Sequence, residues 1–266
     1  MIGPYRDTKT FSGLSETSRS FRFEMENPVS DVLALVENLR DRRVIDLTQT
    51  LEEHMPHFPT HSMFFHNLWG SYWHGTRSLS YQLVMHEHNG THVDAPAHFI
   101  SDAQPDAHVT IERVPLTQLM GRGVRVDCRG MKAGEYASEG QLHEWEDRHG
   151  PLQAGDIVLF DFGWAVNWGL RPHDRHYLEN WPGVGMDAAE YLLSKPVAAI
   201  GVDTLSPDPP EALGTRPIHP VVLEKQVLII ENLCNLDQLP DFFLFLAFPL
   251  KIRKGSGSPI RAVGLI

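Results

Sequence analysis

The chain has 266 residues, of which 42% are hydrophobic and 21% charged, a composition typical of globular proteins that excludes a disordered or fibrous one. Its length suits one large domain with a sizeable core. The formal net charge is −11, and Lys and Arg never form a run longer than a pair, which argues against a surface for nucleic acid or acidic lipid.

The two cysteines, Cys128 and Cys234, lie far apart and lack CxxC spacing, so the sequence indicates neither a disulfide framework nor a thiolate zinc site. A reducing cytoplasm is therefore the expected location. Residues 1–10 lack the apolar stretch of a signal peptide, and the longest apolar run, 242–250, is too short to span a bilayer. We expect no membrane association.

The N-terminal part is expected to form an arm followed by a helix. Residues 1–30 are rich in Ser, Thr and Arg and show little periodicity, so we expect an extended arm that docks on a neighbouring subunit. Ser30 is the expected N-cap of a helix over 31–43, where apolar residues recur at helical spacing.

Strands and helices alternate in the pattern of the remaining chain. Segment 44–48 predicts a strand, and the alternation of apolar and polar residues over 79–86 predicts another, with one face buried. Further strands are expected at 123–127, 155–163, 197–203, 227–232, 242–248 and 259–265. Helices are expected at 138–148, 187–194 and 218–225. The pattern predicts a mixed α/β domain in which the long Pro-rich loop 203–217 is a candidate functional segment.

The segment HNGTHVDAPAHF, residues 88–99, carries three histidines and an aspartate within eleven positions. A helical HExxH site is excluded, because Asn89 stands where the glutamate belongs and because Gly90 and Pro96 oppose a continuous helix. In an extended chain His92 and Asp94 point to the same side, and a turn at Gly90 brings His88 to them.

Two imidazoles and one carboxylate form a mixed ligand set that suits Zn²⁺ or Mn²⁺ and leaves coordination positions open. His98 lies beyond the proline and is free to carry protons instead. The alternative is that these are solvated or hydrogen-bonding loop histidines, which is the better interpretation of any one of them alone. Their clustering favours the metal site.

The same segment resembles the pattern HxGTHxDxPxHF of the cyclase-like metal-dependent hydrolases of the kynurenine formamidase and isatin hydrolase type. The resemblance extends over residues 44–266 through IDLTQTL (45–51), GVDTLSPDP (201–209) and IHPVVLEKQVLIIENLCNL (218–236). It implies a single mixed-sheet α/β domain of the swivelling β/β/α type at 44–266, preceded by an arm and helix at 1–43.

The resemblance also implies the roles of the site residues. His88, His92 and Asp94 are expected to bind a first metal, Asp94 to bridge to a second held by His219 and Glu231, and His98 to act as the proton shuttle. Without it, His219 reads as a hydrogen-bonding residue at a helix start and Glu231 as a charge at a strand end. Because isatin hydrolase-like members work with one manganese, one or two ions of Mn²⁺ or Zn²⁺ are expected.

The function implied is hydrolysis by a metal-activated water that opens a cyclic amide or lactone of a planar aromatic small molecule. The alternatives are an arylformamidase acting on N-formylkynurenine, a dienelactone-type lactonase, a non-catalytic metal or small-molecule binding module, and a structural protein with incidental histidines. Covalent catalysis is less favoured, because the chain has no GxSxG motif and neither cysteine has an evident histidine partner.

Aromatic residues are the candidates for contact with a planar substrate, and several fall in the stretch 63–75. The candidate substrate-binding residues are Phe58, Phe65, Trp69, Trp73 and Phe99. The alternative is that the aromatics of 63–75 pack in the core or in a subunit interface. The expected partners are a small-molecule substrate and further copies of the chain, in a homodimer or homotetramer.

Overall fold

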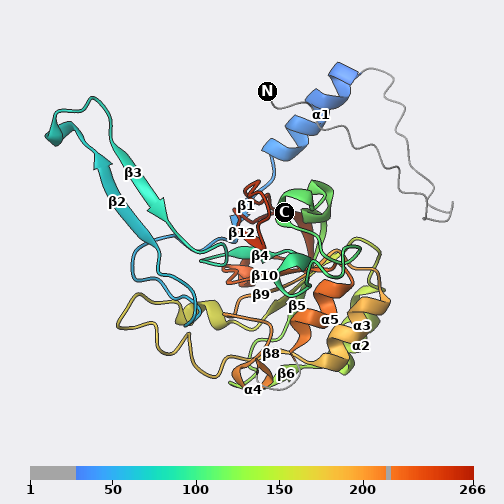
Figure 1. Ribbon diagram of the computed structural model, residues 1–266. Helices are drawn as coiled ribbons and strands as arrows, with labels where there is room; N and C mark the ends of the chain where they lie inside the picture. Colours follow the sequence, from blue (N-terminus) through green and yellow to red (C-terminus); the bar gives the residue numbers. More distant parts are fainter. Residues whose placement is uncertain (1–27, 214–216) are drawn as a thin grey trace. The chain divides into compact units, whose positions relative to one another are not determined.

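The computed structural model describes residues 28–213 and 217–266 (Figure 1). The chain divides into two compact units, Met1–Asp41 and Arg42–Ile266. Helix α1 (Pro28–Arg40) belongs to the first unit. It begins before Ser30, so the expected cap lies inside the helix, and Pro28 takes the first helical position that proline favours. Residues 1–27 of the expected arm lie outside the described residues.

The second unit is built on a nine-stranded mixed sheet. In spatial order the strands are β1 (Val44–Asp46), β13 (Val263–Leu265), β11 (Phe242–Leu246), β5 (Met120–Asp127), β7 (Ile157–Asp161), β9 (Ala199–Val202), β10 (Leu228–Glu231), β4 (His92–Asp94) and β12 (Gly257–Pro259). The four central strands β5, β7, β9 and β10 are parallel, and the pairs outside them are antiparallel. Central strands read as unbroken apolar runs because both of their faces are buried.

Helices α2 (Glu139–His149), α3 (Met186–Ser194) and α5 (Ile218–Glu224) lie side by side along one face of this sheet (Figure 1). Helix α2 begins with a capping box, in which Ser138 accepts from the backbone of Gln141 and the Gln141 side chain accepts in return. Alternate residues of the strands, such as Phe160 and Leu159, belong to separate apolar clusters, one for each face of the sheet.

Two further strands, β2 (Phe65–Gly70) and β3 (Ser80–Val84), form an antiparallel hairpin that projects from the body of the second unit (Figure 1). A short 3₁₀ turn, Tyr72–His74, lies at its tip. The strand expected at 79–86 is present, but the expectation that one of its faces is buried is wrong, because every residue of β3 is exposed. We call residues 65–84 the hairpin.

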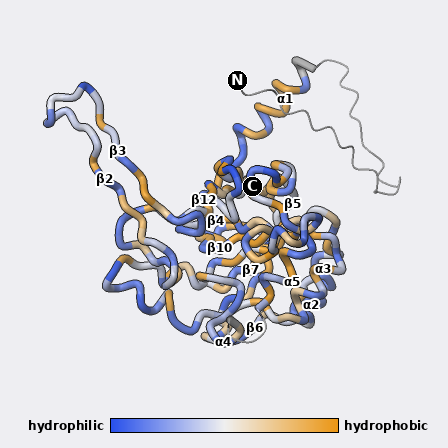
Figure 2. Tube along the Cα trace, viewed as in Figure 1, coloured by the Kyte–Doolittle hydropathy of each residue, from blue (hydrophilic) through white to orange (hydrophobic). Residues whose placement is uncertain are grey.

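The remaining elements are small. Strand β6 (Tyr136–Ala137) pairs with β8 (Gly183–Val184), and α4 (Pro210–Leu213) is a short helix within the loop expected at 203–217. Apolar residues concentrate in the sheet and on the inner sides of the helices (Figure 2). Among the described helices, none has the length and apolar character needed to cross a membrane.

Candidate metal centre

The histidine segment enters the sheet as β4, between β10 and β12. His92 and Asp94 lie two residues apart on this strand and so point to one face, as expected. Glu231, at the end of β10, is directly opposite His92 in the strand register. His88 reaches the same place through a tight turn at Gly90, whose φ of 64° is the left-handed conformation that glycine adopts readily. His219 comes from the first turn of α5.

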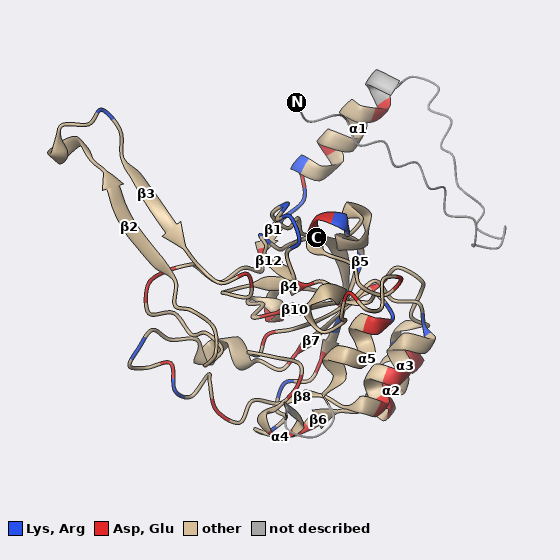
Figure 3. Ribbon diagram, viewed as in Figure 1, with Lys and Arg blue, Asp and Glu red and all other residues tan. Residues whose placement is uncertain are grey.

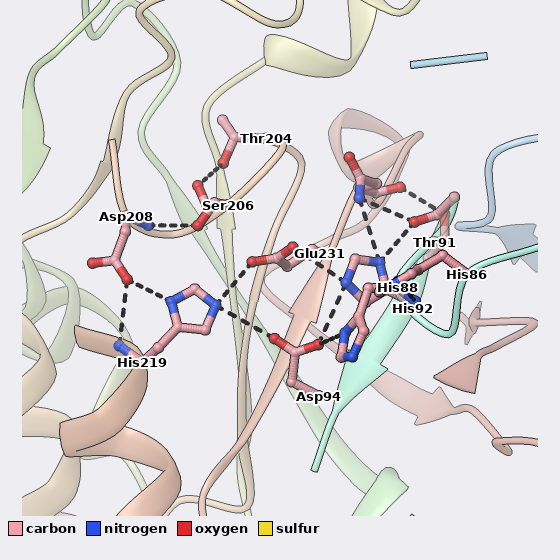
Figure 4. A network of polar contacts seen from close by, with 12 residues as sticks. His86, His88, Thr91, His92, Asp94, Thr204, Ser206, Asp208, His219 and Glu231 are labelled. Carbon is pink, nitrogen blue, oxygen red and sulfur yellow. Dashed lines mark hydrogen bonds and ion pairs between the residues drawn. The ribbon is translucent and has the colours of Figure 1, made fainter. Parts of the chain in front are cut away.

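These five side chains meet in one buried cluster (Figure 4). Asp94 is at its centre: Oδ1 is 2.6 Å from His88 Nδ1 and 3.4 Å from His92 Nε2, and Oδ2 is 3.4 Å from His219 Nε2. The Glu231 carboxylate lies 3.2 Å from both His92 Nε2 and His219 Nε2. The ligand atoms of His88, His92 and Asp94 lie within 4.8 Å of one another, as do those of Asp94, His219 and Glu231.

The nitrogens of His92 and His219 that face away from the cluster are held by hydrogen bonds. Nδ1–H of His92 donates to the carbonyl of Gly90 at 2.9 Å, and Nδ1–H of His219 donates to the Asp208 carboxylate. Asp208 also accepts the backbone N–H of Ile218 at 2.6 Å, which fixes it against the start of α5. Each bond assigns the proton to Nδ1 and leaves Nε2 as the ligand atom, the arrangement usual for metal-binding histidines.

His88 is held through a serine. Its Nε2 lies 2.8 Å from Ser256 Oγ, and both the backbone N–H and the hydroxyl of Ser256 donate to Glu87 at 2.8 Å. Because the hydroxyl proton is committed to Glu87, Ser256 Oγ accepts from Nε2–H of His88, and the lone pair of Nδ1 faces Asp94. Gly257 permits this approach, since a Cβ there would lie 2.5 Å from the His88 ring.

The electrostatics of the cluster favour positive charge. Burial alone would lower the pKa of His92, but the hydrogen bonds with Asp94 and Glu231 outweigh burial and raise the pKa to about 10. Burial alone would also lower the pKa of His219, but its hydrogen bonds with Asp208, Asp94 and Glu231 outweigh burial and raise the pKa well above its ordinary value. Burial would raise the pKa of Asp94, yet its electrostatic interaction with the His88 ring and the hydrogen bond from His219 keep it well below its usual range.

Three imidazole nitrogens and two carboxylates, closely spaced and buried, form a donor set that fits a divalent metal ion. The two groups of three share Asp94, whose two oxygens face opposite groups. The sequence interpretation therefore named residues that the fold does bring together. It missed Glu87, Ser256 and Asp208, which hold the histidines. Of these, only Asp208 falls in one of the motif stretches that carry the family resemblance, GVDTLSPDP at 201–209, and Ser256 has no local signal.

The cluster opens on a cavity of about 200 Å³. Four of the five candidate ligands line it, and its other walls are Phe58, Thr60, His61, His98, Phe99 and Ser206. A larger cavity of about 830 Å³ lies elsewhere in the second unit, and none of the described ligand candidates lines that one. The candidate site is therefore identified by the metal-binding side chains that line the smaller cavity, and not by cavity volume.

His98 lies beside the ligands without belonging to either group of three. It follows β4 in the 3₁₀ turn Pro96–His98, and its ring stacks on that of His88 with centroids 4.0 Å apart. Burial lowers the pKa of His98 to about 4, so the ring is neutral near pH 7 and able to accept a proton.

His61 is a cavity residue that the sequence did not identify. Its Nδ1 is buried and has no hydrogen-bond partner among the described residues, although buried polar atoms normally have one. The ring stacks on His86 at 4.0 Å, and burial lowers its pKa to about 4. A neutral imidazole at the cavity wall can form a hydrogen bond with a molecule bound in the cavity.

Of the five candidate substrate-binding residues, Phe58 and Phe99 line the cavity. Phe65, Trp69 and Trp73 do not: local strand pairing carries them into the hairpin, where Trp69 is 77% and Trp73 83% exposed. The fold therefore does not bring these three side chains to the cavity of the cluster, and their contact with a substrate stays a prediction.

The cysteines do not provide a nucleophile. Burial raises the pKa of Cys128 to about 12 and that of Cys234 to about 11, so neither is a thiolate near neutral pH. Neither lines the cavity of the histidine cluster among the described residues. This agrees with the expectation that covalent catalysis is the weaker hypothesis.

Comparison with known proteins places this site in a family. The cyclase family model matches residues 45–209. Isatin hydrolase from Roseibium aggregatum is 31% identical over 198 residues, 69% of this chain and 73% of the relative, and kynurenine formamidase from Erythrobacter litoralis is 31% identical over 224 residues, 84% and 93%. A solved isatin hydrolase bound to the product analogue thioisatinate has a TM-score of 0.82 at 26% identity, covering 90% of this chain and 98% of that one. The chain belongs to the cyclase family.

Proposed function

We propose that this metal-dependent hydrolase opens a cyclic amide or lactone in a planar aromatic small molecule. The observation that carries the proposal is the histidine and carboxylate cluster at the wall of a small cavity flanked by Phe58 and Phe99. Aromatic walls suit a planar ring. The similarity to isatin hydrolases in sequence and in fold supports this choice of substrate class.

For the cofactor we propose Mn²⁺ or Zn²⁺, in one or two ions. His88, His92 and Asp94 would hold the first ion, and His219 and Glu231 would hold either a second ion or the water of a single one. When bound, the cation supplies Lewis acidity that activates a water and polarises the carbonyl. Because Asp94 belongs to both groups of three candidate ligands, the cluster is compatible with one metal ion or with two.

His98 is the residue to which we assign proton transfer. Its ring nitrogen takes a proton from the attacking water and gives one to the departing nitrogen or oxygen. Its neutrality near pH 7 and its contact with the His88 ring support this role. Phe58 and Phe99 orient the aromatic part of the substrate, and His61 Nδ1, which has no partner within 28–213 and 217–266, hydrogen-bonds to a polar group on it.

Kynurenine formamidase activity is the second candidate. The relative from Erythrobacter litoralis is matched over 93% of its own length, a larger share than the 73% for the isatin hydrolase from Roseibium aggregatum. The same cluster and the same His98 would serve cleavage of an N-formyl group, because both reactions attack an amide carbonyl and protonate a nitrogen.

The test is a substrate panel with metal-stripped protein reloaded with Mn²⁺ or Zn²⁺. Isatin, N-formylkynurenine and a dienelactone are supplied in parallel, and ring opening or deformylation is followed by absorbance. We expect isatin to have the highest kcat/KM. A preference for N-formylkynurenine would replace the main proposal by the second. Turnover of none of the three by fully loaded protein would support a binding module instead.

We also propose that the chain works in the cytoplasm and as a homodimer or homotetramer. Both cysteines are free, which supports a reducing compartment. Many large apolar side chains are exposed, in a number that supports association between copies.

A further inference from the structure

Ser206 is a wall of the cavity that the chemistry above does not use. It lies in the loop that follows β9 and is 2% exposed. Buried polar groups in folded proteins normally make the hydrogen bonds that their atoms allow. A buried hydroxyl that borders the cavity therefore raises the question of where its proton is directed.

The hydroxyl of Ser206 accepts one hydrogen bond and donates none within residues 28–213 and 217–266. Its Oγ accepts the backbone N–H of Asp208 at 3.1 Å. Because a serine hydroxyl has one donor proton beside its two lone pairs, the proton remains available. The backbone carbonyl of Ser206 is held separately, by the hydroxyl of the buried Thr204 at 2.8 Å. The loop is thus held without use of the Ser206 proton.

Ser206 and His98 lie at different ends of the ligand cluster. Asp208 connects Ser206 to the His219 end, because it accepts from His219 Nδ1–H while its own backbone N–H donates to Ser206. The ring of His98 instead stacks on that of His88. Figure 4 shows Ser206 and Asp208 on one side of the central carboxylates and His88 on the other. A substrate in the cavity therefore lies between Ser206 and His98.

This arrangement matches the two polar ends of an amide or ester group. The carbonyl oxygen and the leaving nitrogen or oxygen lie on different sides of the carbon that water attacks. When the leaving atom is directed to His98, to which we assign proton transfer, the carbonyl oxygen is directed away from it, towards Ser206. That oxygen gains negative charge during the attack, and a hydrogen-bond donor aimed at it stabilises the transition state.

The cavity walls offer this oxygen no charged side-chain donor. Among the described residues that line the cavity there is no Lys or Arg. Strands β4 and β10, which carry candidate ligands, contain acidic and no basic residues (Figure 3). Phe99, whose ring centroid is 4.9 Å from that of His219, is a wall at the same end and has no polar hydrogen. The Ser206 hydroxyl is therefore the side-chain donor best placed for the carbonyl oxygen.

We propose that Ser206 is a further catalytic residue, whose hydroxyl donates a hydrogen bond to the carbonyl oxygen of the bond that is cleaved. The inference rests on the proposed hydrolase function. In the reaction the water oxygen bonds to the carbonyl carbon, the carbon–nitrogen or carbon–oxygen bond breaks, and His98 moves a proton from the water to the leaving atom. Ser206 keeps its proton throughout, so it needs no base and forms no covalent bond to the substrate.

The test compares metal-loaded wild type and Ser206→Ala on isatin, or on N-formylkynurenine if the substrate panel prefers it. We expect kcat to fall roughly 10–100-fold, the worth of a hydrogen bond to a charged group. KM should stay nearly unchanged, because the charge on the oxygen develops only in the transition state. Ser206→Cys, whose thiol is a weak donor, should give an intermediate kcat. Titration with Mn²⁺ should give both variants the metal affinity of the wild type.

A second measurement separates contact with the substrate from a role in the shape of the loop. When sulfur replaces the oxygen of the scissile carbonyl, the acceptor becomes weak, so Ser206→Ala should cost less activity with this analogue than with the oxygen substrate. The matched control is Thr204→Val, which removes a hydrogen bond from the same loop and leaves the Ser206 hydroxyl in place. Its kcat should be close to that of the wild type.

The outcomes distinguish this inference from the function on which it rests. Equal kcat values for wild type and Ser206→Ala, or an equal loss with the sulfur analogue, would overturn the catalytic hydroxyl alone. The same holds if Thr204→Val loses as much activity, or if the metal affinity of Ser206→Ala falls as far as its kcat. Absence of turnover of every panel substrate by loaded wild type would overturn the proposed function and this inference together.

Discussion

Each ligand histidine in the cluster has one nitrogen directed at the carboxylates and the other held by a hydrogen-bond acceptor. For His92 the acceptor is a backbone carbonyl and for His219 a carboxylate, but for His88 it is the hydroxyl of Ser256. The hydroxyl accepts from His88 because it donates its own proton in a hydrogen bond to the Glu87 carboxylate. The tautomer of a ligand therefore depends on a side chain distant in sequence.

Ser256→Ala is expected to weaken metal binding by ~10–100-fold, the usual cost of losing a group that orients a metal-ligating histidine. Isothermal titration of the metal-stripped protein with Mn²⁺ measures the change. The control is Ser258→Ala, a buried serine two residues further along the chain, whose hydroxyl accepts from Leu250 N–H instead. Equal affinities of wild type and Ser256→Ala would remove the serine from the site.

His98→Ala should lose most turnover and keep its metal. General acid–base groups contribute ~10²–10⁴-fold to the rate, and His98 belongs to neither ligand group. Steady-state kinetics and elemental analysis of the same preparation separate the two effects. His143→Ala, on the exposed surface of α2, is the control. Loss of metal together with activity would make His98 a ligand.

At the scale of elements, the turn at Gly90 connects two ligands. Its positive φ sets the path from His88 to β4, and its carbonyl accepts the His92 Nδ1–H. A Cβ at this position would lie 2.4 Å from a methyl group of Leu51. Any other residue would therefore both strain the backbone at this positive φ and clash with Leu51.

Gly90→Ala is expected to lower the free energy of unfolding by at least ~1–2 kcal/mol, the cost of a left-handed residue with a side chain, and to weaken metal binding as well. Gly75→Ala is the matched control, because its φ is also positive, at 79°, while a Cβ there meets nothing within 4 Å. Urea unfolding and metal titration are measured for both. If Gly90→Ala binds metal like Gly75→Ala, the turn does not position the ligands.

The elements that sequence patterns predict well are those whose pattern has one physical cause. The apolar run over 155–163 is a central strand because a buried parallel strand needs apolar residues on both faces. The break at Gly90 and Pro96 excludes a helix, and the structure has a short strand and a 3₁₀ turn there. Alternation over 79–86 predicts a strand but does not say whether anything covers it, which is why the buried face expected of β3 is wrong.

The same limit applies to the candidate site. His88, His92 and Asp94 were predicted from local spacing, because a strand and a turn bring near neighbours together. His219 and Glu231 come from α5 and β10, and only the family resemblance pointed to them. Ser256 and Glu87 act through hydrogen bonds made when β12 lies beside β4, a pairing that no short-range pattern encodes.

At the scale of the whole molecule, the metal is expected to contribute to stability. A cation that binds the folded cluster and not the unfolded chain adds RT ln(1 + [M]/Kd), roughly 2.7 kcal/mol at 100 times Kd. In the cluster, the carboxylates that hold the cation would otherwise be buried together, which costs free energy.

Removal of metal with excess EDTA should therefore abolish turnover and lower the melting temperature, and Mn²⁺ or Zn²⁺ should restore both. Differential scanning calorimetry and elemental analysis follow the two states and give the number of ions per chain. Glu231→Ala tests the second group: it should lose metal, turnover or both. Full turnover after long incubation with EDTA would rule out a metal-dependent reaction.

The stacked rings of His61 and His86 have a consequence for how the hairpin can vary. His61 precedes β2 and lines the cavity, His86 follows β3, and the centroids of the two rings are 4.0 Å apart. The chain therefore leaves and re-enters the body at nearly the same point, like an insertion with adjoining ends. Such a segment can be shortened, lengthened or replaced by a tight turn without changing the distance that the body has to bridge. The length of the hairpin is thus free to change independently of the cavity from which it starts.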